Sequence, residues 1–89
     1  MSQDELTAAS EELRSAAEAA DGETQDRLTE QAEALAELAM SDRDPDHGRL
    51  DRHMNILSEI ARETSGEVSE RTQAARDHVF EYRKGVEGV

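Results

Sequence analysis

The chain has 89 residues, no cysteine, one Tyr, one Phe and a formal net charge of −12. This length predicts one small domain, residues 1–89, and the lack of cysteine excludes disulfides and thiolate chemistry. The negative charge disfavours nucleic acid and anionic membranes as partners, because both require clustered Lys and Arg. No apolar run reaches the roughly 20 residues that span a bilayer, and the acidic N-terminus is unlike a signal peptide. We therefore expect a cytoplasmic protein.

Acidic residues greatly outnumber basic ones, and arginine replaces lysine almost entirely. There are 22 acidic and ten basic residues, and Lys84 is the only lysine. This composition is typical of halophilic proteins, because concentrated salt screens repulsion while carboxylates keep the surface hydrated. High net charge and low hydrophobicity are also the signature of disorder. The regular apolar spacing along the chain favours a folded protein.

The first segment, residues 3–40, has the apolar spacing of a helix. Ser2-Gln3-Asp4-Glu5 fits a capping box, which predicts a helix that begins near Gln3. Asp21-Gly22 resembles a helix stop, yet the apolar pattern resumes beyond it. At about 100° per residue, four later leucines fall within roughly 40° of Leu6: Leu13, Leu28, Leu35 and Leu38. The preserved phase favours one continuous helix, with Gly22 costing about 1 kcal/mol.

The middle loop, residues 41–48, contains the only proline. Asp44 is expected to cap the next helix, with Pro45 at its first position. Asp42, Asp44 and Asp46 alternate as in a calcium-binding loop. The glycine of that motif comes one position late, however, and His53 stands where a bidentate Glu is required. Turn formation and capping are the favoured roles of this loop.

The second segment, residues 45–84, repeats the design of the first. Ser65-Gly66 interrupts it, but the apolar phase again continues beyond the glycine. The two halves share residues at an offset of 44. This match indicates that the glycine at the same position in each half is not a coincidence. Leu6, Leu13, Ala17, Gly22, Glu23, Arg27 and Glu37 correspond to Leu50, Leu57, Ala61, Gly66, Glu67, Arg71 and Glu81.

These patterns predict an all-α fold with two possible architectures. The favoured one is an antiparallel hairpin of two long helices. The alternative is a monomeric up-down-up-down four-helix bundle, broken at Gly22 and Gly66. A lone hairpin leaves apolar flanks uncovered, so we expect it to form a homodimer, itself a four-helix bundle. The candidate interface residues are Leu6, Leu13, Leu28, Leu35, Leu38, Leu50, Leu57, Ile60, Val68, Val79, Phe80 and Tyr82.

No constellation of residues indicates catalysis or a cofactor. His47, His53 and His78 lack the spacing of zinc-peptidase and di-iron motifs, so we assign no metal ligands. A weak metal-binding bundle is the least favoured alternative. The sequence also lacks a glycine-rich phosphate loop and an ordered nucleophile and base, so we expect that the protein is not an enzyme.

The only concentration of basic residues lies near the C-terminus, at Arg76, Arg83 and Lys84. It is too small, in too negative a field, for a nucleic-acid site. We expect it to contact acidic residues of a partner subunit instead.

The segments Asp21-Gly22-Glu23-Thr24-Gln25-Asp26-Arg27-Leu28 and Asp44-Pro45-Asp46-His47-Gly48-Arg49-Leu50 resemble those of a small family of uncharacterised, acidic, all-helical proteins from halophilic archaea. The resemblance covers most of the chain. It implies a helical fold and a cytoplasm of high salt. It implies no activity and no site residues.

The sequence therefore favours a non-enzymatic helical module for protein–protein interaction, which self-associates through its leucine stripes. The alternative is an acidic regulator that mimics nucleic acid and binds a basic partner protein. The first depends on the apolar spacing and the second on the net charge.

Overall fold

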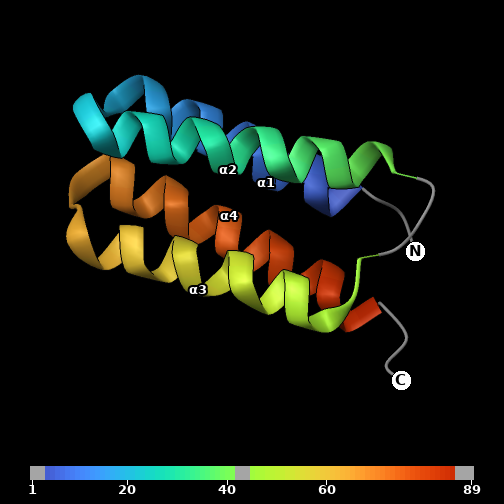
Figure 1. The fold of residues 1–89 in the computed structure, drawn as a ribbon. Coiled ribbons are helices and arrows are strands. Elements are labelled where there is room, and N and C mark those ends of the chain that lie inside the picture. The colour runs from blue at the N-terminus through green and yellow to red at the C-terminus, as the bar shows by residue number, and fades with distance from the viewer. Residues whose placement is uncertain (1–3, 42–44, 86–89) are drawn as a thin grey trace.

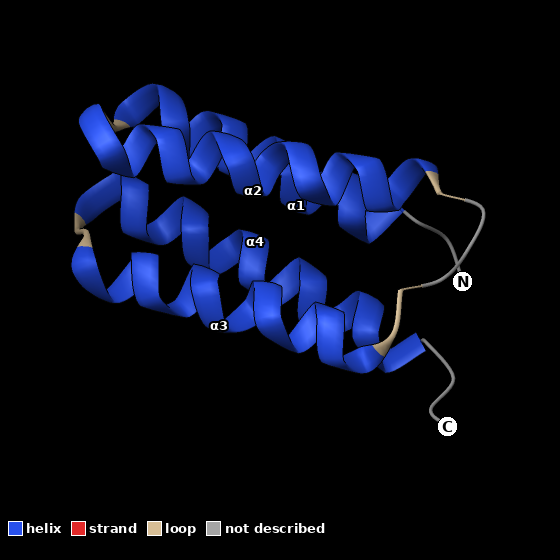
Figure 2. Ribbon diagram, viewed as in Figure 1, coloured by secondary structure: helices blue, strands red, loops and turns tan. Residues whose placement is uncertain are grey.

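The structure, a computed structural model, describes residues 4–41 and 45–85. It contains four helices, α1 (Asp4–Ala19), α2 (Gly22–Met40), α3 (His47–Glu63) and α4 (Gly66–Gly85) (Figure 1). No strand occurs among the described residues (Figure 2). The predicted all-α class and the four-helix bundle are therefore confirmed, in the form that is complete within one chain.

Each of the two glycines is the first residue of a new helix, directly after the break that follows α1 or α3, so the prediction of two continuous helices is wrong. Gly22 has a φ of 62° and Gly66 a φ of 63°. This left-handed backbone breaks the helical hydrogen-bond ladder, and glycine adopts it without the penalty that a Cβ brings. The turn is alike in both halves and returns each following helix to the same core. An apolar stripe that stays in phase is therefore compatible with a turn that reverses the direction of the chain.

Helices α1 and α2 form one layer of the bundle, and α3 and α4 form the other (Figure 1). Both glycine turns lie at one end, where Ala20, Asp21, Thr64 and Ser65 line a shared depression. The beginnings of α1 and α3 and the ends of α2 and α4 lie at the opposite end.

Helix α3 begins two residues later than the sequence predicts. Its N-cap is Asp46, whose carboxylate accepts a hydrogen bond of 2.7 Å from the backbone N–H of Arg49. The predicted cap, Asp44, lies outside the described residues. Pro45 precedes the helix and is buried, as is Leu50, and the two occupy the positions of a hydrophobic staple. The Asp46 carboxylate thus satisfies one of the free amides of the first helical turn, which is the role that the sequence assigned to Asp44.

The core runs between the two layers, but its four sides are not alike. The helix pairs α1–α2, α1–α4 and α3–α4 approach closely, whereas the backbones of α2 and α3 do not. The 44-residue offset relates the α1–α4 pair to the α2–α3 pair. Ala9 and Ala75, both fully buried, correspond to His53 and Gln31. Small side chains at these positions allow α1 and α4 to approach, and large polar ones hold α2 and α3 apart.

Candidate functional site

The predicted interface residues lie inside this single chain. Most are at most 1 % exposed: Leu6, Leu13, Leu28, Leu35, Leu50, Leu57, Ile60, Val79 and Tyr82. Leu38 is 8 % exposed, and Val68 is partly buried against the same core. Only Phe80, at 39 % exposed, projects from the surface. The glycine turns fold each stripe against the other half of the chain, so the stripes are occupied without a second copy.

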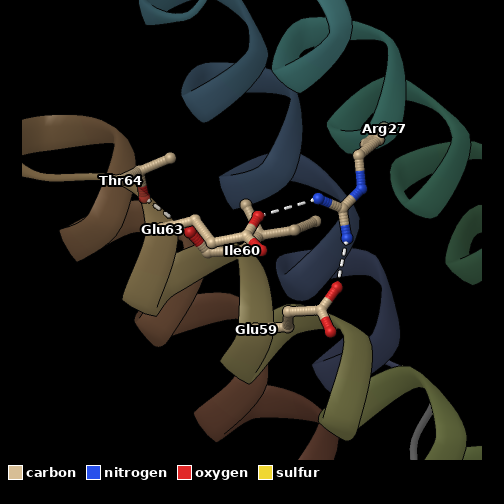
Figure 3. A network of polar contacts seen from close by, with 5 residues as sticks. All are labelled: Arg27, Glu59, Ile60, Glu63 and Thr64. Carbon is tan, nitrogen blue, oxygen red and sulfur yellow. Dashed lines mark hydrogen bonds and ion pairs between the residues drawn. The ribbon is translucent and has the colours of Figure 1, made fainter.

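A polar seam joins α2 to α3 where their backbones are apart (Figure 3). The Arg27 guanidinium bridges Glu59 at 2.8 Å and Glu63 at 3.0 Å. The hydrogen bond with Glu59 and then that with Glu63 raise the pKa of Arg27. All three side chains are at least one-third exposed, so we expect only a modest contribution to stability.

His53 lies deeper in the same seam. Its Nδ1 is 2.7 Å from Oε1 of Gln31, and the residue is 9 % exposed. An amide oxygen can only accept, so this pairing places a proton on Nδ1. Burial lowers the pKa of His53, and the positive charges of Arg49 and Arg52 lower it further. His53 is thus a buried residue whose ring forms a hydrogen bond between α3 and α2.

Charge divides sharply between the two layers. Residues 1–44, which include α1 and α2, contain 13 acidic and three basic side chains, a net charge of −10. Residues 45–89, which include α3 and α4, contain nine acidic and seven basic side chains, a net charge of −2. The α1–α2 layer therefore carries nearly all of the protein's net charge.

The acidic residues of the α1–α2 layer also differ in their pairing. Two that face the other layer are paired, Glu12 with Arg71 at 3.1 Å and Glu5 with His78 at 2.7 Å. Seven of the exposed ones have no ion-pair partner among the described residues: Glu11, Glu18, Glu23, Asp26, Glu30, Glu33 and Glu37. A dense set of unneutralised carboxylates thus covers the outside of this layer.

On the α3–α4 layer, the basic side chains near the end of α4 contact other side chains of the same layer. Arg83 pairs with Asp51 at 2.7 Å, and the Lys84 ammonium lies 4.8 Å from the centre of the Phe80 ring. Arg76 Nε donates to Ser58 Oγ at 2.7 Å, beside a depression of about 430 Å³. The basic residues that we expected to reach a partner subunit thus have partners within the chain.

The outer surface of the α1–α2 layer instead has an apolar groove. It has a volume of about 280 Å³ and is lined by Thr7, Ser10, Glu11, Arg14, Ala36, Ala39 and Met40. Met40 is 83 % exposed. The apolar spacing of the sequence does not single out these residues. The 44-residue offset could have found them, because it places Ala36, Ala39 and Met40 where the second half has Phe80, Arg83 and Lys84.

The structure assigns no ligand role to the loop acids or the histidines. Asp42 and Asp44 lie outside the described residues, and Asp46 caps α3. Within residues 4–41 and 45–85, no group of three or more His, Asp and Glu side chains is arranged to hold a metal ion. Over the same residues, no helix is both long and apolar enough to cross a membrane.

The chain belongs to a protein family of unknown function, DUF7553, whose model matches residues 1–85. This family agrees with the resemblance to uncharacterised proteins. No curated protein and no solved structure matches the chain significantly.

Proposed function

We propose that this protein is a non-enzymatic interaction module whose α1–α2 layer binds a basic surface of a partner protein. The observation that carries the proposal is the uneven charge, −10 in residues 1–44 against −2 in residues 45–89. Complementary charge speeds the encounter of two proteins and selects the partner. The proposal combines the interaction module and the acidic regulator that the sequence suggested.

The pairing of the carboxylates supports this choice of layer. On α3 and α4, most acidic side chains have a cation nearby, as in the pairs Asp51–Arg83 and Glu81–Lys84. On the outside of α1 and α2, Glu30, Glu33 and Glu37 lack such partners among the described residues. Unpaired surface charges repel one another and destabilise the compact state. A basic partner would relieve that repulsion.

Binding of a labelled, lysine-rich helical peptide tests the proposal. Two variants remove the same charge from opposite layers, Glu30→Gln/Glu33→Gln on α2 and Glu70→Gln/Asp77→Asn on α4. We expect the α2 variant to weaken binding about fivefold in roughly 0.1 M salt and the α4 variant to change it less than twofold. At this ionic strength the screening length is about 10 Å, so each charge acts mainly on a partner bound to its own layer. Equal effects of the two variants would exclude a role specific to the α1–α2 layer.

We also propose that the protein works in concentrated salt in a cytoplasm. The support is the excess of carboxylates and the single lysine. Salt of about 2 M screens charges beyond a few ångströms, which weakens purely electrostatic binding. It strengthens apolar contacts when the ions are excluded from protein surfaces. A partner in such a medium must therefore be held partly by apolar contact.

Self-association is a second proposal, supported by one residue. Phe80 is 39 % exposed on α4, and an exposed aromatic side chain is a common interface anchor. A homodimer built on Phe80 differs from the predicted one, because it leaves the core of each chain intact. Light scattering on the native protein and on Phe80→Ser tests it. A native dimer that the substitution dissociates is expected, and a native monomer at tens of micromolar would contradict it.

A further inference from the structure

The two outer faces of the bundle can be compared position by position, because the halves are related by an offset of 44. On the α3–α4 face, a ring, a guanidinium and an ammonium cover the helix–helix junction. On the α1–α2 face, the corresponding positions carry two methyl groups and a thioether. The pairs are Phe80 and Ala36, Arg83 and Ala39, and Lys84 and Met40.

The contacts within the α3–α4 face show what such a junction accommodates. Arg83 extends across the junction to Asp51, and Lys84 lies over the Phe80 ring. The residue that corresponds to Asp51 is Thr7, which lines the α1–α2 groove and has no charge. The missing side chains leave a depression of about 280 Å³ beside Met40. Its apolar lining consists of Ala36, Ala39 and Met40.

The groove and its surroundings indicate one kind of occupant. Glu11 lies in its wall, and Glu33 and Glu37 are exposed on the same helix as its alanines. Arg14 is the one cation among the lining residues. A cationic group is therefore favoured around the groove, and an apolar side chain is favoured within it.

We propose that this groove binds a basic amphipathic α-helix of a partner protein, with an apolar side chain against Ala36, Ala39 and Met40 and cations near the surrounding carboxylates. This inference rests on the proposed function and adds the shape of the partner. Side chains three and four residues apart lie on one face of a helix, as Phe80 and Lys84 do on α4. An amphipathic helix inserts its apolar face into a groove through this spacing.

A second copy of the chain is a poorer occupant. The exposed aromatic and basic end of α4 belongs to the α3–α4 layer, whereas the groove belongs to the opposite layer. A contact between opposite layers is head-to-tail, so it builds rings or filaments of many copies rather than a two-fold dimer. Assembly of many copies of a chain with a net charge of −12 is opposed by repulsion between them.

Fluorescence anisotropy with two peptides tests the inference. One is a helix of about 18 residues with a leucine stripe and lysines elsewhere, and the other has the same composition without the stripe. Ala36→Phe fills the groove without changing charge, and Ala39→Arg introduces the side chain that fills the other face. Ala19→Arg is the matched control, because Ala19 is exposed at the far end of the same layer.

We expect the striped peptide to bind even in about 1 M salt, where surface charges are screened. Both groove variants should weaken it about tenfold or more, and Ala19→Arg should weaken it less than threefold. Circular dichroism checks that each variant folds. Equal binding of the two peptides, unaffected by the groove variants, would overturn the groove while the charge-based function stands. Failure of both peptides to bind at low salt would overturn the proposed function itself. Polymerisation that Ala36→Phe abolishes would identify a second copy as the occupant and contradict the inference.

Discussion

Gln25 and Ser69 occupy the same place in the two halves of the chain, each three residues after a left-handed glycine. Gln25 Nε2 donates to the Ala17 carbonyl at 2.7 Å, and Ser69 Oγ donates to the Ala61 carbonyl at 2.9 Å. Ala17 and Ala61 are themselves 44 residues apart. The last carbonyls of a helix lack internal partners, and here the next helix supplies a donor in both halves. This equivalence supports an internal duplication that the sequence alone only suggested.

Replacing either turn glycine with alanine should destabilise the protein. A Cβ at Gly22 or Gly66 would meet no atom within 4 Å, so the penalty comes from the backbone angle alone. We expect each substitution to lower the free energy of unfolding by about 1–2 kcal/mol in urea titrations. Gly48→Ala is the control, because Gly48 lies in the first turn of α3 and a Cβ there makes only ordinary contact. We expect it to be neutral or slightly stabilising. A neutral Gly22→Ala would contradict the left-handed turn.

Removing the cap of α3 should also destabilise the fold. Asp46→Ala loses the acceptor for the Arg49 amide, and we expect a loss of about 1 kcal/mol. Asp46→Asn retains a side-chain oxygen and should lose much less. The free energies of unfolding of the two variants, measured side by side, decide whether Asp46 is the cap. An equal loss in both would mean that the carboxylate acts through its charge.

His53 should make stability depend on pH in the mildly acidic range. Its pKa in the folded protein is lowered from 6.5 by burial and by Arg49 and Arg52. As the pH falls, the His53 ring is therefore protonated in the unfolded chain before it is protonated in the folded protein. The contribution of neutral His53 to the free energy of unfolding is complete above pH 6.5 and declines as the pH falls below that value. Between pH 6.5 and 5, we expect the native protein to lose on the order of 1 kcal/mol more than His53→Gln. If the free energy of unfolding depends on pH in the same way in both proteins, His53 is not the group responsible.

Salt should stabilise the bundle. Repulsion within the α1–α2 layer is unscreened in dilute buffer, so we expect helical circular dichroism to decrease below about 0.5 M KCl. Glu30→Gln/Glu33→Gln should lower the salt requirement more than Glu70→Gln/Asp77→Asn, because the former pair lies in the layer with the larger charge. Full helicity of the native protein without added salt would contradict the proposed adaptation.

The sequence predicted the helical class and the apolar stripes, but not where the helices end. Apolar spacing selected Leu6, Leu35 and Tyr82 as interface candidates, whereas the structure buries all three in the core of a single chain. The same spacing gave the wrong connection at Gly22, since it takes no account of a turn that returns the chain to that core. A glycine at the same position in both halves was the better indicator.

The candidate site was less predictable than the core. Ala36 and Ala39 look like ordinary helix formers, and their significance depends on what the opposite face contains. The groove arises because α1 and α2 pack with small residues at their outer junction. Its lining residues extend from residue 7 to residue 40, so no short stretch of the sequence predicts it. The charge of each half could be counted at once, but only the fold shows that it defines a layer.

Chemical-shift mapping on the ¹⁵N-labelled protein shows which layer of the bundle binds a basic partner. The striped basic peptide is titrated into the folded protein, and the amide signals of all four helices are followed. We expect the largest changes at Ala36, Ala39 and Met40 on α2 and at Thr7 and Glu11 on α1, with α3 largely unchanged. Changes that centre on α3 and α4 would contradict the assignment of the α1–α2 layer as the interaction surface.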